Sequence, residues 1–186
     1  MHLINLNKTK ETNFDFNKSG DYFVYFSNLS GKYSFNIRAS GINLDINGIY
    51  IGNKTDNFTL QTYQNHFLRG SISNLLIKGV FYDQAKFNYQ GLIRIEKQAQ
   101  QSHAYQKNQN ILMSEDCFVL SKPDLEILAD DVFCTHGSTT GQLDEDQLLL
   151  LQMRGLSKKQ GQACLVDGFI SEIVEKIRIY DNGYAL

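Results

Sequence analysis

The sequence predicts a mainly β protein that ends in a small helical subdomain. The first observation is a series of short β-prone runs from Tyr22 to about Cys134, separated by glycine, asparagine and serine, which are typical of tight turns. The second is a change after Gly141, where patterns typical of helix starts and ends begin. A chain of 186 residues is long enough for one domain with a small appendage and for a core that needs no disulfides.

The β-prone runs, in chain order, are "YFVYF", "YSFNI", "INLDI", "FTLQTY", "NLLIKGVFY", "KFNYQGLIRI", "CFVL" and "LEILAD". In "SFNI" and "INLDIN" apolar and polar residues alternate, which indicates sheets with one buried face. The polar segment 97–110, "KQAQQSHAYQKNQN", interrupts this pattern, and we expect it to be a long connection.

Short strands of this kind occur in sandwiches, barrels and solenoids. A repeat of fixed length would indicate a solenoid, but the sequence has no crisp one. Neighbouring runs such as "SNLLIKGVFY" and "AKFNYQGLIRI" are compatible with stacked strands. The residue pattern alone therefore permits a parallel β-helix without preferring it.

The first helix is expected within "LDEDQLLLLQMRG". Asp144 is a plausible N-cap with Gln147 three residues later, and Arg154 with Gly155 matches the chemistry of a helix end. The helix contains four consecutive leucines, Leu148 to Leu151. A small helical cap with so many leucines is expected to expose apolar surface on more than one side, which favours contact with a partner.

Two further short helices are expected after it. In "SKKQGQACLVDG", Ser157 and Gln160 have the spacing of a capping box. A third helix, "GFISEIVEKI", carries one apolar stripe at helical spacing, formed by Ile170, Ile173, Val174 and Ile177. Helices this short are marginal in water, so each must pack on the others, on the β half or on a partner. The ordinary interpretation of an apolar helix face is that it packs within its own protein.

Charge and composition exclude several classes of function. The net charge is −2 and the pI is near 6.1, with no basic block, so we expect no binding to nucleic acid. The amino terminus lacks the apolar core of a secretion signal, and no segment approaches the ~20 apolar residues that span a bilayer. Three cysteines in such a chain are typical of reduced thiols. We therefore expect a cytoplasmic protein without a membrane partner.

The catalytic motifs that the sequence resembles are all incomplete. "GNKT" at 52–55 lacks the spacing of a phosphate-binding loop, so no nucleotide is expected to bind to this chain. In "HGSTTG" a nucleophile elbow would need serine where Thr139 stands. Paired acidic and basic residues of a β-helix carbohydrate enzyme are not clustered on any strand. A closed zinc site would need paired ligands that the chain lacks. We therefore predict that the chain is not an enzyme.

Cys134 and His136 form the one pair with metal-ligand chemistry. On an extended strand, residues i and i+2 point to the same face about 7 Å apart, so both side chains could approach one metal or cluster. Two ligands are an incomplete site that needs a second chain or a small thiol. The alternative is that both are ordinary structural residues. The adjacent Asp130 and Asp131 would point to opposite faces of a strand and make a poor catalytic pair.

Residues 122–177 resemble the carboxy-terminal signature of the SufB/SufD scaffold family of iron-sulfur cluster assembly. The matching pieces are "KPDLEILADDVFCTHGSTTGQLDEDQL", then "RG" at Arg154 and Gly155, then "GF" at Gly168 and Phe169. The preceding "AYQKNQNILMSED" also resembles the family, so the likeness covers roughly the last eighty residues. Family members are usually much longer than this chain.

The resemblance implies a right-handed parallel β-helix over residues 1–140 and a helical subdomain over residues 141–186. In the family this subdomain docks an ABC-type ATPase, SufC, and the ends of β-helices pair in a scaffold dimer. Residues expected to contact the ATPase are Leu148, Leu151, Arg154, Gly155, Gly168 and Phe169. The absence of a phosphate-binding loop agrees with a chain whose partner, and not the chain itself, hydrolyses nucleotide.

The same resemblance implies a role for the Cys/His pair. "CTHG" at 134–137 is similar to SufD, whose histidine at the position of His136 is implicated in cluster formation at the dimer interface, whereas SufB members tend to have glutamate where Gly137 stands. A transient iron-sulfur cluster held by Cys134 and His136 at a homodimer or heterodimer interface is the leading hypothesis. The alternative is a docking or adaptor module that has lost cluster chemistry.

Overall fold

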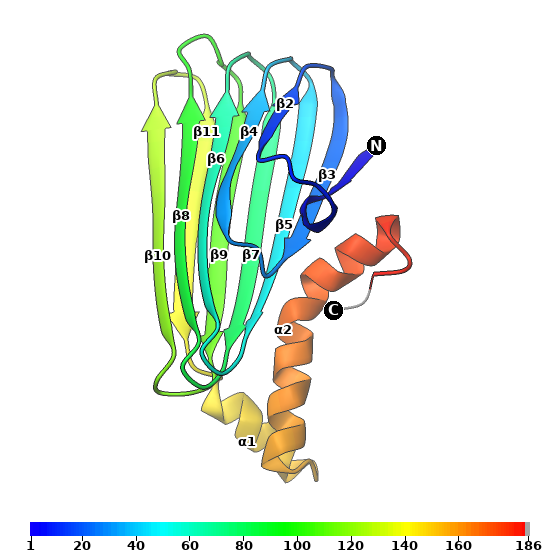
Figure 1. Ribbon diagram of the computed structural model, residues 1–186, viewed down its shortest axis with the longest axis vertical. Helices are drawn as coiled ribbons and strands as arrows, with labels where there is room; N and C mark the ends of the chain where they lie inside the picture. Colours follow the sequence, from blue (N-terminus) through cyan, green and yellow to red (C-terminus); the bar gives the residue numbers. More distant parts are fainter. Residues whose placement is uncertain (185–186) are drawn as a thin grey trace.

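The computed structural model describes residues 1–184, and these form two parallel β-sheets wound into one β-helix (Figure 1). The odd-strand sheet consists of β1 (His2–Asn5), β3 (Gly20–Ser27), β5 (Ile42–Gly52), β7 (Ile72–Phe81), β9 (His103–Leu112) and β11 (Phe133–Gly141). The even-strand sheet consists of β2 (Asn13–Phe16), β4 (Gly31–Ile37), β6 (Asn57–His66), β8 (Lys86–Ile95) and β10 (Phe118–Ile127). The chain alternates between the sheets, so each strand pairs in parallel with the strand one coil away.

The coils differ in length, which is why the sequence shows no fixed repeat. His2 pairs with Tyr22, 20 residues later, whereas Phe87 pairs with Val119, 32 residues later. The early coils are short and the later ones are longer, chiefly because the strands lengthen from 4 residues in β1 and β2 to 10 in β8 and β9. A solenoid was one of the architectures that the pattern left open, and the structure identifies it as the fold.

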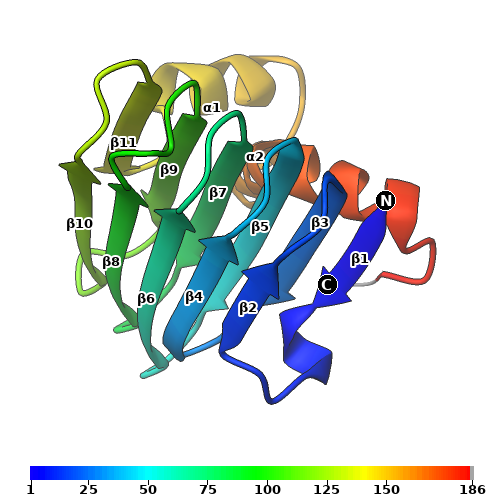
Figure 2. The same ribbon diagram turned by 90° about the horizontal axis from the view of Figure 1, so that it is seen from above.

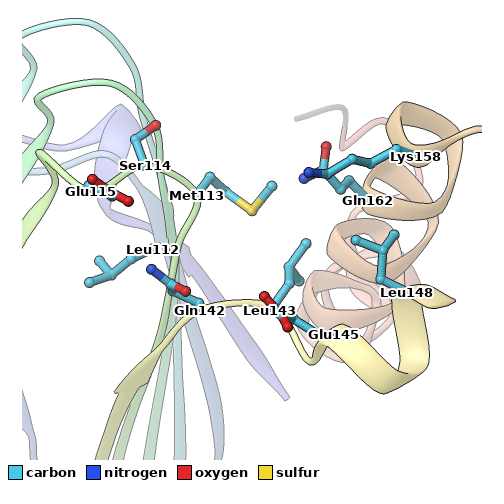
Figure 3. Close-up of a pocket in the computed structure, with 10 residues that line it drawn as sticks. All are labelled: Leu112, Met113, Ser114, Glu115, Gln142, Leu143, Glu145, Leu148, Lys158 and Gln162. Atoms are coloured by element: carbon cyan, nitrogen blue, oxygen red, sulfur yellow. The ribbon is translucent and has the colours of Figure 1, made fainter.

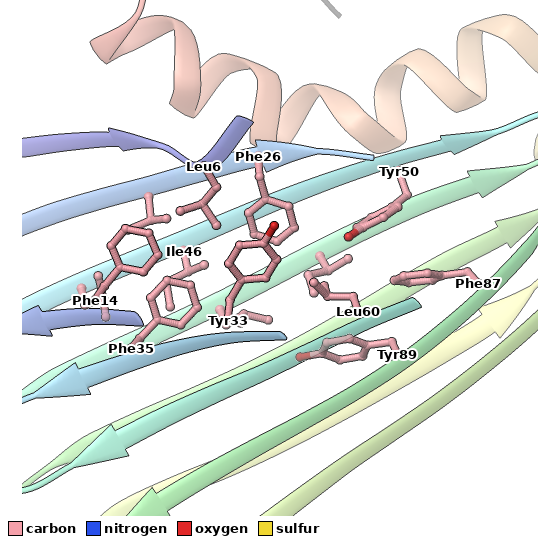
Figure 4. Close-up of a cluster of buried hydrophobic side chains, with 14 of the residues drawn as sticks. Leu6, Phe14, Phe26, Tyr33, Phe35, Ile46, Tyr50, Leu60, Phe87 and Tyr89 are labelled. Atoms are coloured by element: carbon pink, nitrogen blue, oxygen red, sulfur yellow. The ribbon is translucent and has the colours of Figure 1, made fainter. Parts of the chain in front are cut away.

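The core fills the lumen between the two sheets (Figure 4). Aromatic rings stack along it, as where Tyr50 and Phe87 lie with ring centroids 4.3 Å apart. A Cβ at Gly48 would lie 2.6 Å from the Phe26 ring, so this close approach requires glycine. At the amino-terminal end Leu6, in the short 3-10 helix η1 (Leu6–Lys8), is buried over the core. This end of the lumen is therefore closed by the chain itself.

Two expectations for the β half were wrong. Most of the segment 97–110, expected to be a connection, belongs to β9, whose alternate residues Gln106, Asn108 and Asn110 are buried in the lumen although they are polar. The runs "CFVL" and "LEILAD" are not two strands, because one strand, β10, passes through Pro123. An edge strand tolerates proline at a position where its missing N–H would face away from the sheet.

The helical subdomain contains two helices rather than the three expected, α1 (Glu145–Met153) and α2 (Lys158–Tyr180). The N-cap at Asp144 is confirmed, since its side chain accepts from the backbone N–H of Asp146 and Gln147. The capping box of Ser157 and Gln160 is also confirmed. The second and third expected helices are one, because the stripe packing beyond Gly168 outweighs the ~1 kcal/mol that glycine costs within a helix.

Helix α2 lies along the outer face of the odd-strand sheet, and neither helix of residues 1–184 covers the outer face of the even-strand sheet (Figure 2). Its apolar stripe is buried as the sequence predicts, with Ile173, Val174 and Ile177 packed on Phe23, Tyr25, Ile49 and Leu76. At the end of the helix, the Tyr25 hydroxyl donates to Asp181 Oδ2 over 2.5 Å. The helix thus crosses several coils and fixes them to one another.

Candidate functional site

The two ends of the β-helix are unlike. The strand orders end at β10 and β11, so within the described chain each of these strands has one unpaired edge (Figure 2). Large apolar side chains are exposed on this last coil rather than covered, and Phe133 is 64% exposed. The others are Phe118, Leu120, Leu125, Ile127 and Leu128. This carboxy-terminal end is the open end of the β-helix.

Cys134 and His136 lie on β11 at this open end. They pair in register with Ala104 and Gln106 of β9, both of which are buried in the lumen. Cys134 packs against an apolar cluster that includes Ile93. Because alternate residues of a strand share a face, His136 follows Cys134 on the lumen side. The structure therefore places the two predicted ligands together, one partly covered and one at the rim.

The two side chains differ in their surroundings. Cys134 is half-buried, and this burial raises the pKa of its thiol to about 11. The thiol is therefore protonated at neutral pH, and a metal must displace the proton before sulfur can bind as thiolate. His136 is exposed to solvent. Within residues 1–184, no group of three or more His, Cys, Asp or Glu side chains is placed to hold a metal ion, so the donor set on one chain stays incomplete.

The other cysteines and the acidic pair lie elsewhere. The Cys117 thiol is buried and donates to the Phe81 carbonyl over 3.1 Å, while Cys164 is exposed on α2. Asp130 and Asp131 lie in the loop between β10 and β11 with exposed side chains, not on a strand. None of these residues adds a ligand to Cys134 and His136.

The free edge of β11 presents a regular row of hydrogen-bonding groups. The Phe133 N–H donates to the Ser102 carbonyl, so odd-numbered residues of β11 donate toward β9. The N–H groups of the even-numbered residues, Cys134 and His136 among them, therefore face the open edge. Such an edge is a template for pairing with another strand.

The free edge of β10 is interrupted. Even-numbered residues donate toward β8, as Phe118 and Leu128 do to Ala85 and Ile95. Odd-numbered residues therefore face the open edge, and Pro123, in the middle of them, has no N–H to offer. Of the two edges, β11 is the one suited to continuous strand pairing.

The residues expected to contact an ATPase divide between the surface and the packing of the subdomain. Leu148 is buried against α2, where a Cβ at Gly161 would lie 2.8 Å from Leu148 Cδ1, and Leu151 is half-buried. Arg154 and Gly155 form the end of α1, with Gly155 at φ +95°. The apolar residues that α1 exposes are Leu149, Leu150 and Met153, and none of them is among the residues predicted to contact an ATPase.

Gly168 and Phe169 lie in the middle of α2. Nothing lies within 4 Å of a Cβ built on Gly168, so open space adjoins it. The Phe169 carbonyl accepts a hydrogen bond from Lys78 Nζ, and its ring lies 4.8 Å from the same ammonium. Phe169 therefore contributes to holding α2 on the sheet.

A cleft of about 300 Å³ lies between the turn that follows β9 and the two helices (Figure 3). Met113 reaches across it toward Lys158 and Gln162 of α2, and Leu143 and Leu148 line it next to α1. A second hollow of about 420 Å³ also borders Leu143. The linker between β11 and α1 therefore has open space on two sides, and α1 packs on α2.

Comparison with known proteins identifies the family. Residues 27–169 match the model of the family described as SUF system FeS cluster assembly, SufBD core domain. The chain belongs to the SufBD family. That match spans most of the β-helix together with α1 and the first half of α2.

Among the curated relatives of this SufBD chain is the iron-sulfur cluster assembly protein SufD of Escherichia coli (strain K12), 32% identical over 135 residues, which are 73% of this chain and 32% of the relative. SufD of Bacillus subtilis (strain 168) is 32% identical over 128 residues, 69% of this chain and 29% of the relative. The chloroplastic protein ABCI7 of Arabidopsis thaliana is 39% identical over 88 residues, 47% of this chain and 18% of the relative. The SufBD chain thus spans about a third or less of these relatives. No helix within the described residues is both long and apolar enough to cross a membrane.

Proposed function

We propose that this SufBD chain is a non-enzymatic scaffold subunit of iron-sulfur cluster assembly. The observation that carries the proposal is the placement of Cys134 and His136 on the lumen side of β11, at the open end of the β-helix. Thiolate and imidazole are both accepted ligands of iron-sulfur clusters. The cluster would be a transient cargo at this end, assembled and then passed on.

The incomplete donor set supports a site shared by two chains. The uninterrupted edge of β11 could pair with a strand of a second scaffold, either a copy of this chain or another SufB/SufD-type protein. Such pairing would cover the exposed apolar side chains around Phe133. It would also bring donors from the partner toward Cys134 and His136.

The exposed surface of the helical subdomain is the second feature that favours an ATPase partner. Leu149, Leu150 and Met153 form an exposed apolar face on α1, and α1 is linked to β11 through residues 142–144. We assign this face to a SufC-type ABC ATPase, the partner that the family resemblance implies for the helical subdomain. Movement of α1 by such an ATPase would reach the Cys134 strand through a linker of only three residues.

The raised pKa of Cys134 favours a second candidate, a docking or adaptor module without cluster chemistry. A thiol that is protonated at neutral pH, in a set of only two ligands, is a weak metal site on one chain. The adaptor would keep the β11 edge and the α1 face but would bind no iron.

Anaerobic reconstitution with ferrous iron and sulfide tests the proposal. The protein should develop visible charge-transfer absorption, and the double variant Cys134→Ala with His136→Ala should lose it while keeping the wild-type melting temperature. Cys164→Ala is the matched control, because this thiol is exposed on α2 and should not alter the absorption. Equal loading of the double variant would reject the ligand assignment. Absence of absorption in the wild type, alone and with a partner scaffold, would support the adaptor.

A further inference from the structure

Gln106 is a buried lumen residue of β9 whose amide is only partly satisfied. Its Nε2 donates to the Gly91 carbonyl over 3.3 Å, while its Oε1 is buried without a hydrogen-bond partner. Gly91 makes this position possible, because a Cβ there would overlap the amide. The glycine therefore lets the Gln106 side chain cross the lumen from one sheet to the other.

An unpaired buried carbonyl oxygen is unusual, since buried polar groups are nearly always hydrogen-bonded. Neighbouring amides of the same strand are not alike in this respect. Asn108 and Asn110 bond to each other, and Asn110 also donates to Thr140 Oγ1 over 3.3 Å. The Gln106 Oε1 atom can therefore accept a hydrogen bond from a neighbouring donor.

His136 is the residue directly above Gln106. The two are paired in register on adjacent strands, which lie about 4.8 Å apart. His136 is exposed, so its ring is not enclosed by the packed core. The amide is held against Gly91, whereas the imidazole is exposed. Because the two residues are in register and both side chains lie on the lumen side of their strands, the imidazole is the neighbour of the Gln106 amide in the same lumen row.

We propose that Gln106 is the positioning residue of His136, accepting one ring N–H and leaving the other ring nitrogen bare and directed to the open end. A neutral imidazole has one donor and one acceptor nitrogen, and a hydrogen bond at one nitrogen fixes which of them can bind a metal. This inference rests on the proposed function, in which His136 is a cluster ligand. Gln106 itself touches neither iron nor sulfide.

Gln64 provides a matched control. It is also a fully buried lumen glutamine with an unsatisfied amide, but it lies on β6 of the even-strand sheet and is paired with Phe35 and Ile93. It is not in register with His136. Replacing Gln64 by leucine removes a similar buried amide without removing the proposed acceptor.

The ring tautomer of His136 is the direct readout. Long-range ¹H–¹⁵N correlation spectra of the apo protein, at about pH 8.5 where ordinary histidines are neutral, distinguish a single tautomer from a mixture. The His136 signals are assigned by their loss in His136→Ala. We expect one dominant tautomer in the wild type and in Gln64→Leu, and a mixture in Gln106→Leu and Gln106→Met. Gln106→Glu keeps an acceptor oxygen and should restore the single tautomer. The same spectrum in wild type and in both apolar variants would overturn the proposal.

Cluster loading separates this inference from the proposed function. Loss of positioning typically weakens metal binding by ~10–100-fold, so Gln106→Leu should require about tenfold more iron for half-maximal absorption while Gln64→Leu requires the wild-type amount. If the Cys134→Ala, His136→Ala variant loads normally, the proposed function fails whatever the tautomer shows. If that variant fails to load but Gln106→Leu keeps both the tautomer and the loading of the wild type, only the Gln106 inference fails.

Discussion

Lys78, on the outer face of the odd-strand sheet, forms an ion pair with Glu172 of α2 over 2.6 Å. The lysine side chain is only 7% exposed, whereas the glutamate is 52% exposed. Lys78 also donates to the Phe169 carbonyl one turn earlier in the helix. A buried ammonium therefore joins β7 to α2 at the middle of the helix.

Removing the carboxylate of this pair should cost more than removing the ammonium. Glu172→Gln leaves Lys78 buried with only the Phe169 carbonyl, and we expect a loss of about 1–2 kcal/mol in the free energy of unfolding. Lys78→Met replaces the ammonium by an apolar side chain of similar length and should cost less than Glu172→Gln. Urea unfolding measures both. Lys176→Met is the control, because the more exposed pair with Asp45 spans 3.8 Å and should be worth less than about 1 kcal/mol.

The same ion pair predicts a pH dependence. The hydrogen bond from Lys78 lowers the pKa of Glu172 from its ordinary value. A carboxylate with a lowered pKa contributes stability that is present above its unfolded pKa of about 4.3 and is lost as the pH falls through the folded value. The wild type should therefore lose stability below about pH 4.3 more steeply than Glu172→Gln. If the free energy of unfolding falls equally steeply with pH in both proteins below about pH 4.3, the ion pair does not contribute to the acid sensitivity.

Cys134 should react slowly with iodoacetamide at neutral pH. Burial raises the pKa of this thiol to about 11, so the reactive thiolate is scarce at pH 8 and becomes abundant only as the pH approaches 11. Cys164 is exposed on α2 and should be alkylated first. Mass spectrometry of peptides from timed reactions between about pH 7 and 11 measures both rates. Equal rates for the two cysteines at pH 8 would contradict the assignment.

Local signals allowed parts of the fold to be predicted from the sequence. Asp144 and the Ser157–Gln160 box are complete within four residues, so their chemistry is readable without tertiary information. Gly168 was misread as a helix boundary because the packing that carries α2 through it comes from strands far away in the sequence. The coil repeat was hidden because its length varies. Residues stacked in one row of the lumen also change from apolar to polar, as from Leu75 to Gln106 to His136.

The site was only partly readable for the same reason. The spacing of Cys134 and His136 places both on one strand face wherever the strand lies. Gln106 was missed, since a polar segment was interpreted as a connection. The signal that could have found it is the period-two placement of Ala104, Gln106, Asn108 and Asn110 between less buried neighbours.

The exposed face of α1 should be needed for binding a SufC-type ATPase. Leu149→Glu with Leu150→Glu places charges on side chains that are 56% and 49% exposed, so the fold should tolerate them while apolar docking is lost. Co-purification of a co-expressed SufC-type ATPase should fall at least about tenfold, with an unchanged melting temperature. Lys159→Glu, an exposed charge change on α2, is the control and should keep the ATPase bound. Full retention of the ATPase by the double variant would remove α1 as the docking face.

Proline at neighbouring positions of β11 separates pairing at the free edge from pairing within the sheet. The Ser138 N–H faces the open edge and the Thr139 N–H faces β9, because odd-numbered residues of β11 donate inward. Ser138→Pro should therefore keep the fold but weaken dimer formation, because it removes an N–H from the open edge of β11. Thr139→Pro removes a hydrogen bond of the sheet and should lower the melting temperature more than Ser138→Pro does. Light scattering coupled to size-exclusion chromatography gives the oligomeric state, and thermal unfolding gives the stability. A proline at the centre of an edge strand interrupts a continuous ladder of hydrogen bonds between two chains. A Ser138→Pro protein that dimerises as tightly as the wild type would therefore show that the scaffold pairs through another surface.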